Sequence, residues 1–175
     1  MYMAGYGKLI GYVEISKSGD VFHDFFRHKP HEMVAISPGK VHDCELHEGE
    51  RGAVGSVITW HYTEGGKKRT AKQIIESVNE ENHTIVFKVI GGEPDVEKLH
   101  KSFKIIFHVE PKGEGQVVTW TFEFEKVDPS VPYETNLMDY LCNLIKDLDA
   151  HNKAAIISES ILWTWILIEF GFGGQ

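Results

Sequence analysis

The chain has 175 residues, enough for one domain with its own hydrophobic core. Hydrophobic residues make up 42% and charged residues 25%, which is ordinary for a globular protein, and the formal net charge is −8. This negative charge disfavours nucleic acids and anionic membranes as partners, because both are bound mainly through basic side chains.

The N-terminal residues lack the basic segment followed by an apolar segment that marks a secretory signal. The two cysteines, Cys44 and Cys142, are far apart in the sequence and do not suggest a disulfide framework. We therefore expect a cytoplasmic protein whose thiols stay reduced.

Residues 8–16 alternate between apolar and polar side chains and are predicted to form a strand. Phenylalanines at helical spacing follow, and Pro30 is expected to end the first helix and begin another, which gives two short helices over residues 19–36. No long helix is predicted among the next segments. The further predicted strands are residues 40–47, 54–63, 67–78, 83–91, 99–110 and 116–127.

Short polar turns join these strands, so neighbouring strands are expected to be antiparallel. In most of them one side is apolar and rich in aromatic residues, whereas the other side carries Thr, Lys, Glu and His. This alternation is typical of an antiparallel sheet that is covered on one face only.

Residues 133–152 are predicted to form one long helix, because leucines recur along one side at helical spacing. One long helix and two short ones are few for about seven strands, and a wide antiparallel sheet must twist and curl. The aromatic side chains of the inner face can therefore fill a solid core or surround a cavity. Packed interiors are the rule, and the pattern alone leaves both alternatives open.

The C-terminal residues include the apolar run "ILWTWILIEFGFGG" at residues 161–174. A membrane-spanning helix needs about 20 apolar residues, and Glu169 interrupts this shorter run, so no membrane span is expected. One interpretation is a terminal strand or an irregular extension. The other is a segment that associates with another surface, which would give weak self-association of an otherwise monomeric protein.

Four segments carry a resemblance to a known family: "GSVITWHYTEGGKKRTAKQIIESVNEENHTIVFKVIGG", "LHKSFKIIFHVEPKGEG", "VVTWTFEFEK" and "LMDYLCNLIKDLDAH". With the order of elements, they resemble the birch-pollen-allergen (Bet v) superfamily, and specifically its major latex protein branch, the kirola-like or ripening-related proteins of plants. The resemblance covers about residues 5–152. We therefore expect one domain over residues 1–152 and an atypical apolar tail over residues 153–175.

The resemblance implies an α+β fold of the START-like, helix-grip type. In this fold a curved seven-stranded antiparallel sheet grips a long C-terminal helix, two short helices follow the first strand, and a hydrophobic cavity is enclosed. It also implies binding or carriage of small hydrophobic molecules, such as plant metabolites, hormones or lipids, in a pathogenesis-related or stress role, without a cofactor. The residues predicted to line the cavity are Ile58, Trp60, Tyr62, Ile85, Phe87, Phe103, Ile105, Phe107, Val118, Trp120, Phe122, Met138, Leu141 and Ile145.

Three glycines, Gly49, Gly52 and Gly55, occupy the position of the glycine-rich loop of the superfamily. They do not form a nucleotide site, because the Gly-Lys-Ser/Thr of a P-loop is absent and a strand follows where that motif requires a helix. The loop is expected to be a tight connection whose glycines permit unusual backbone angles. Arg51 stands where the branch usually has an aromatic residue, which affects the packing of this loop.

The ten histidines do not form a recognisable metal motif. His42 and His47 are predicted on opposite sides of one strand, and His61 and His108 are predicted on the outer face of the sheet. We therefore expect no metal site.

Catalysis is not favoured either, although some enzymes of alkaloid assembly resemble this superfamily and use a cavity-facing lysine with acidic and phenolic partners. Lys88 and Lys104 are predicted to face outward, and the acid–base set is not recognised on the inner face. Tyr62, Tyr133 and Tyr140 remain candidates for hydrogen bonds to a ligand. The alternative function is an enzyme of specialised, alkaloid-type metabolism acting in the same cavity. A hormone-receptor role is less favoured, because the loop around Pro94 shows no latch sequence.

Overall fold

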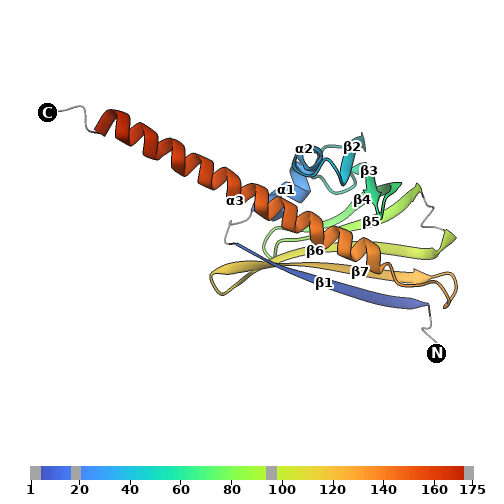
Figure 1. Cartoon of the computed structure of the whole chain (residues 1–175). Helices are drawn as coiled ribbons and strands as arrows, with labels where there is room; N and C mark the ends of the chain where they lie inside the picture. The colour runs from blue at the N-terminus through green and yellow to red at the C-terminus, as the bar shows by residue number, and fades with distance from the viewer. Residues whose placement is uncertain (1–4, 17–20, 94–97, 172–175) are drawn as a thin grey trace.

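The computed structural model describes residues 5–16, 21–93 and 98–171, with the side chains of α3 described up to residue 155. Its described residues form one seven-stranded antiparallel sheet with helices on its concave side and at one end (Figure 1). The predicted α+β helix-grip fold is confirmed. In chain order the elements are β1 (Tyr6–Ile15), α1 (Val21–His28), the 3₁₀ helix η1 (Pro30–Glu32), α2 (Met33–Ile36), β2 (Val41–Glu48), β3 (Val57–Glu64), β4 (Lys67–Asn79), β5 (Thr84–Glu93), β6 (His100–Lys112), β7 (Gly115–Lys126) and α3 (Thr135–Gly171).

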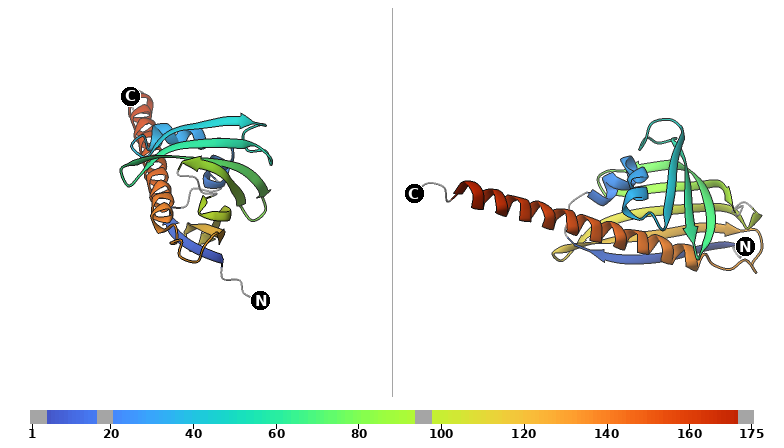
Figure 2. Two further views of the ribbon diagram at one scale, coloured as in Figure 1. Left: turned by 90° about the vertical axis from the view of Figure 1, so that its right-hand side faces the viewer. Right: turned by 45° about the horizontal axis from the view of Figure 1, so that its top comes forward.

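The strands are ordered β1-β7-β6-β5-β4-β3-β2, so the two strands that come first in the sequence form the two edges of the sheet. The sheet is strongly curved, and α3 runs diagonally across its concave side (Figure 2). The predicted alternation holds in the central strands. Phe107 on β6 pairs with Trp120 on β7 and both are buried, whereas the next pair, His108 and Thr119, is half-exposed on the outer face.

The short helices between β1 and β2, namely α1 followed by η1 and α2 in direct succession, close one end of the curved sheet (Figure 2). Phe22, Phe25 and Phe26 are buried from the side of α1 that faces the sheet. The ring of Phe26 lies 5.1 Å from that of Phe107 and 5.4 Å from that of Trp120, measured between centroids. Pro30 begins η1 as predicted, since its missing N–H needs no partner at the first position of a helix.

The long helix α3 packs closely against the edge strand β1, because Gly11 has no side chain. A Cβ atom at this position would lie 2.5 Å from Sδ of Met138 and 3.0 Å from Sγ of Cys142. The backbone of β1 therefore contacts the helix directly. Space remains on the other side of α3, toward β3, β4 and β5, where the cavity lies.

Asp147 ties the middle of α3 to the connection between α2 and β2. Ser37 donates a hydrogen bond of 2.7 Å to Oδ2 of Asp147, and Nζ of Lys40 lies 2.6 Å from the same oxygen. The hydroxyl of Tyr140 donates to the carbonyl of Lys40 at 2.9 Å. Burial alone would raise the pKa of Asp147, but the hydrogen bonds from Lys40 and Ser37 lower it below its ordinary value.

Replacement Asp147→Asn is expected to lower the free energy of unfolding at neutral pH by about 1 kcal/mol, because Lys40 loses a charged acceptor in a site about one-third exposed. The lowered pKa means that this stabilisation is present above the unfolded-state pKa and is lost as pH falls through the folded-state pKa. Urea unfolding of the wild type and of Asp147→Asn should therefore show a difference in unfolding free energy at neutral pH that vanishes near pH 3. Asp139→Asn, an exposed site on the same helix, is the control, and an equal effect of both changes would contradict the role of Asp147.

The expectation of a strand or irregular extension after residue 152 is wrong, because α3 continues to Gly171. The helix has 37 residues, and its last turns lie well beyond the sheet (Figure 1). The reason is local: no glycine or proline occurs between Thr135 and Gly171, so nothing in the backbone chemistry stops the helix at residue 152. In the part of the chain whose side chains are described, no helix is long and apolar enough to cross a membrane. The predicted loop at Pro94 lies outside the described residues.

Candidate ligand cavity

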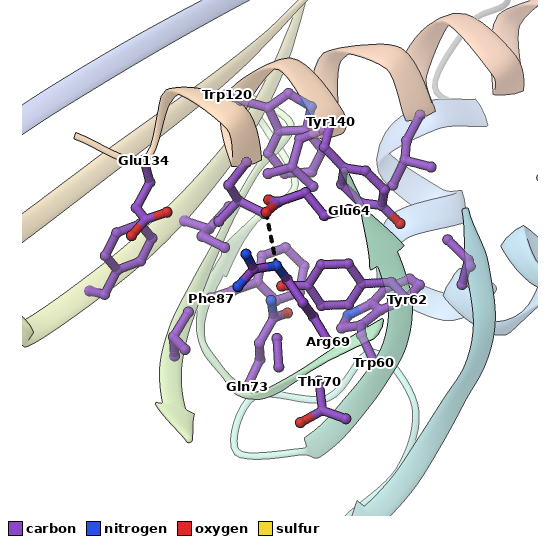
Figure 3. Close-up of a pocket in the computed structure, with 18 of the residues that line it drawn as sticks. Trp60, Tyr62, Glu64, Arg69, Thr70, Gln73, Phe87, Trp120, Glu134 and Tyr140 are labelled. Atoms are coloured by element: carbon purple, nitrogen blue, oxygen red, sulfur yellow. Dashed lines mark ion pairs between the residues drawn. The ribbon is translucent and has the colours of Figure 1, made fainter. Parts of the chain in front are cut away.

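A cavity of about 110 Å³ lies between the inner face of the sheet and α3 (Figure 3). This volume is similar to that of protein cavities that hold one aromatic ring. The interior is thus partly a packed core and partly hollow, so neither of the two sequence-based alternatives holds alone. The cavity is lined by Phe26, Val41, Trp60, Tyr62, Glu64, Arg69, Thr70, Ala71, Gln73, Phe87, Val89, Leu99, His100, Phe103, Ile105, Trp120, Glu134, Leu137, Tyr140, Leu141 and Leu144.

Half of the residues predicted to line the cavity do so, and the others are packed behind its wall. Those at the cavity are Trp60, Tyr62, Phe87, Phe103, Ile105, Trp120 and Leu141. Those not among the lining residues are Ile58, Ile85, Phe107, Val118, Phe122, Met138 and Ile145, all of which are buried. Curvature explains the division, because alternation identifies the inner face but cannot tell where that face is covered by α1 or α3 and where it borders empty space.

The cavity also has a polar end that the sequence analysis missed. Glu64 at the end of β3, Arg69 near the start of β4 and Glu134 just before α3 all line it. Nε of Arg69 lies 3.0 Å from Oε2 of Glu64, and Figure 3 shows the two side chains directed toward each other. The alternation pattern contains the information for this polar end. Glu64 lies on the same side of β3 as the inward-facing Trp60 and Tyr62, and Arg69 is the cross-strand partner of Tyr62.

Burial changes the acid–base properties of this end. It raises the pKa of Glu64 above its ordinary value, an effect that Arg69 opposes and Glu134 adds to. Burial likewise raises the pKa of Glu134, again against the influence of Arg69. It raises the pKa of Tyr62 to about 12, so this phenol stays protonated at neutral pH.

Tyr62 and Tyr140 form an aromatic pair across the cavity wall, with ring centroids 5.3 Å apart. Burial, and then the neighbouring Tyr62, raises the pKa of Tyr140 well above its usual range. The third tyrosine of the sequence prediction, Tyr133, does not line the cavity and is 46% exposed. Its ring contacts Phe124 edge-on at 5.2 Å.

The glycine-rich loop does not line the cavity, although its backbone has the predicted unusual angles. The φ values of Gly49, Gly52 and Gly55 are 76°, 84° and 90°. Arg27 of α1 donates from Nε to the carbonyl of Gly52 at 2.9 Å, which fixes the loop to the helix. Arg51 donates to the carbonyl of Cys44 at 3.3 Å, and this contact accounts for a basic residue in the loop.

The histidines require one correction. His42 and His47 do not point to opposite sides of β2, because their Nε2 atoms approach Thr63 and Thr59, which lie on one face of β3. Irregular register at both ends of β2 shifts the alternation. On this outer face the donor atoms of Asp43, Glu45 and His61 lie within 4.8 Å of one another. The imidazoles of His47 and His61 are within 3.7 Å and 3.6 Å of Glu45 carboxylate oxygens.

The lysines lie where the alternation placed them. Lys88 is exposed, and Nζ of Lys104 pairs with Glu76 at 2.9 Å outside the cavity. Acidic groups that the sequence analysis did not recognise are present at the cavity in Glu64 and Glu134, together with the predicted phenols of Tyr62 and Tyr140. Glu64 is the last residue of β3, and Glu134 directly precedes α3. Cys44 is buried, and burial raises its pKa to about 11, which makes its thiol unreactive.

A curved antiparallel sheet that holds a long C-terminal helix over an internal apolar cavity defines a START-like protein of the helix-grip type. The sequence also matches the family model of the "Pathogenesis-related protein Bet v 1 family" over residues 4–155, and the chain belongs to this family. Ligand binding is typical of the family. The resemblance inferred from the sequence segments is thereby confirmed.

Two relatives place the chain in the major latex protein branch. It is 42% identical to MLP-like protein 31 of Arabidopsis thaliana over 147 residues, which cover 83% of this chain and 85% of that protein. It is 39% identical to ginseng major latex-like protein 151 of Panax ginseng, whose crystal structure superposes with a TM-score of 0.79 and covers 84% of this chain and 97% of that one.

A more distant likeness concerns the fold alone. A truncated norcoclaurine synthase from Thalictrum flavum superposes with a TM-score of 0.63 at 18% sequence identity, covering 82% of this chain and 92% of that one. The same fold therefore supports enzymes as well as ligand-binding proteins.

Proposed function

We propose that the protein binds and carries small hydrophobic molecules, such as plant specialised metabolites, hormones or lipids, in the cavity beneath α3. We connect this carriage with defence or stress responses. The observation on which the proposal rests is the cavity itself, whose walls are formed mainly by aromatic and aliphatic side chains. Apolar walls with a few polar groups at one end are the usual composition of small-molecule sites.

The expected affinity is moderate. A ligand that buries about 300 Å² of apolar surface gains roughly 7 kcal/mol, and association costs at least about 4 kcal/mol. The difference corresponds to weak binding, near millimolar without polar contacts and micromolar with a few good ones. Burial and dispersion are not directional, so several ligands of similar shape should bind. Ligands larger than the cavity must extend past α3 or displace side chains that line it.

Replacement Phe87→Trp should weaken binding about tenfold, because the larger ring occupies space that the ligand needs. The measurement is a fluorescence titration with N-phenyl-1-naphthylamine, an uncharged dye that is sensitive to polarity. Lys88→Trp is the matched control, since it adds the same chromophore to the next, outward-facing residue of β5 and should leave the affinity unchanged. Equal affinities for wild type, Phe87→Trp and a second narrowing variant, Leu141→Trp, would overturn the proposed internal site.

An enzymatic role is the second candidate, favoured by one observation. Glu64 and Glu134 are carboxyl groups with raised pKa values beside the phenols of Tyr62 and Tyr140, which are suitable general acids and bases. No lysine lies among the described residues that line the cavity, so condensation of an amine with an aldehyde would have to rely on these carboxyl groups. Incubation with a panel of amines and aldehydes distinguishes the two functions, because only an enzyme gives product above the buffer rate.

A further inference from the structure

Charged side chains are unevenly distributed along the cavity. Among the described residues that line it, Glu64, Arg69 and Glu134 carry a formal charge, and all three lie at the end formed by the β3–β4 hairpin and the start of α3 (Figure 3). His100, which also lines the cavity, packs its imidazole edge-on against Phe103, with centroids 5.0 Å apart. The polar end thus contains two acidic groups and one basic group, which is an excess of one negative charge.

Arg69 is already engaged with one of the two acids. Its Nε lies 3.0 Å from Oε2 of Glu64, and the side chains are only 24% and 11% exposed, respectively. Glu134 lines the same cavity and is half-buried, and in the described part of the chain no ion pair within 4.0 Å involves it. Two carboxylates that share one cation in a partly desolvated site are best satisfied by a second cation.

Aromatic rings line the cavity near Glu64 (Figure 3). Tyr62 and Tyr140 face each other at 5.3 Å between centroids, and Trp60 precedes Tyr62 on the same side of β3. Carboxylates combined with aromatic faces recognise ammonium groups, through ion pairing and cation–π attraction. The net charge of −8 on the whole chain adds a general attraction for cations.

We propose that the cavity selects amphiphiles with a protonated amine at one end and an apolar body at the other. The ammonium group lies beside Glu134 and Glu64, and the apolar body extends toward Phe87 and Trp120. This inference rests on the proposed function, because it assigns a ligand class to the same cavity. A ligand with a carboxylate head is disfavoured, since it would have to compete with Glu64 for Arg69 and lie close to Glu134.

The test uses three dansyl probes that share one fluorophore and one five-carbon arm. The arm ends in an amine in dansylcadaverine, in a methyl group in N-pentyl dansylamide and in a carboxylate in dansyl-6-aminohexanoate. We expect the amine probe to bind about fivefold more tightly than the neutral probe, and the acid probe to bind more weakly than both. Because the comparison is made on the unaltered protein, it does not depend on the folding of any variant.

The variant Glu134→Gln should abolish the preference for the amine probe, measured as the ratio of its affinity to that of the neutral probe. Glu114→Gln, an exposed change in the turn between β6 and β7, is the matched control and should keep the preference. Equal binding of the three probes, or tightest binding of the acid probe, would overturn this inference while leaving the carrier function intact. Absence of binding by all three would instead count against the carrier function, and with it the inference.

Discussion

Replacement Phe107→Ala is expected to lower the free energy of unfolding by about 3–5 kcal/mol, the usual effect of removing a fully buried aromatic side chain. Phe107 on β6 is 0% exposed. Its ring lies 5.1 Å from those of both Phe26 and Trp120, and these two residues line the cavity. Phe107 therefore supports the cavity wall from behind, and its loss leaves a void that the neighbouring rings can fill only in part.

Urea unfolding followed by circular dichroism measures this effect. Ile106→Ala is the control, because Ile106 is the next residue of the same strand, faces outward and is half-exposed, so its truncation should cost about 1 kcal/mol or less. Comparable losses for the two variants would show that the inner face at Phe107 is not packed as described.

Replacement Gly92→Ala should lower the free energy of unfolding by about 3 kcal/mol, from backbone strain together with a steric clash. Gly92 lies in β5 with a φ of 144°, and a Cβ atom there would be 2.2 Å from the carbonyl oxygen of Thr70. That contact is with backbone, which cannot move aside as a flexible side chain does. Ala71, which pairs with Gly92 on β4, and the preceding Thr70 both line the cavity, so the substitution should also weaken ligand binding.

The matched control for this change is Gly66→Ala in the β3–β4 turn. Gly66 also has a positive φ, 78°, but a Cβ atom there would meet nothing within 4 Å. The free energy of unfolding of this variant should fall by only about 1 kcal/mol, which is the strain that a left-handed backbone imposes on alanine. Thermal unfolding of the two variants separates strain from clash, and equal shifts in Tm would refute the backbone contact at Gly92.

Much of the fold could be predicted from the sequence, because its determinants are local. Alternation of apolar and polar residues identified the strands to within a few residues, and Pro30 marked the boundary between the two short helical segments. The end of α3 was not predicted, since the leucines at helical spacing identified a helix only over residues 133–152. No glycine or proline occurs before Gly171, so the helix continues past the leucine pattern.

The candidate site was predicted only in part, because a cavity depends on how far separated elements fit together. Trp60 and Phe122 look alike as inward-facing aromatics, yet one lines the cavity and the other is packed behind it. The polar end was missed because charged residues at strand ends usually face solvent. Glu64 lies instead beneath α3, where it lines the cavity (Figure 3).

The pairing of the first strand with the last one has a consequence for biosynthesis. Tyr6 of β1 pairs with Glu125 of β7, so the ribosome must deliver nearly the whole domain before β1 finds its neighbour. Until then the nascent N-terminal segment keeps its hydrogen-bonding edge and its apolar side unprotected. Such non-local topologies fold slowly and are prone to aggregation while incomplete, so β1 stays unprotected until β7 has been synthesised.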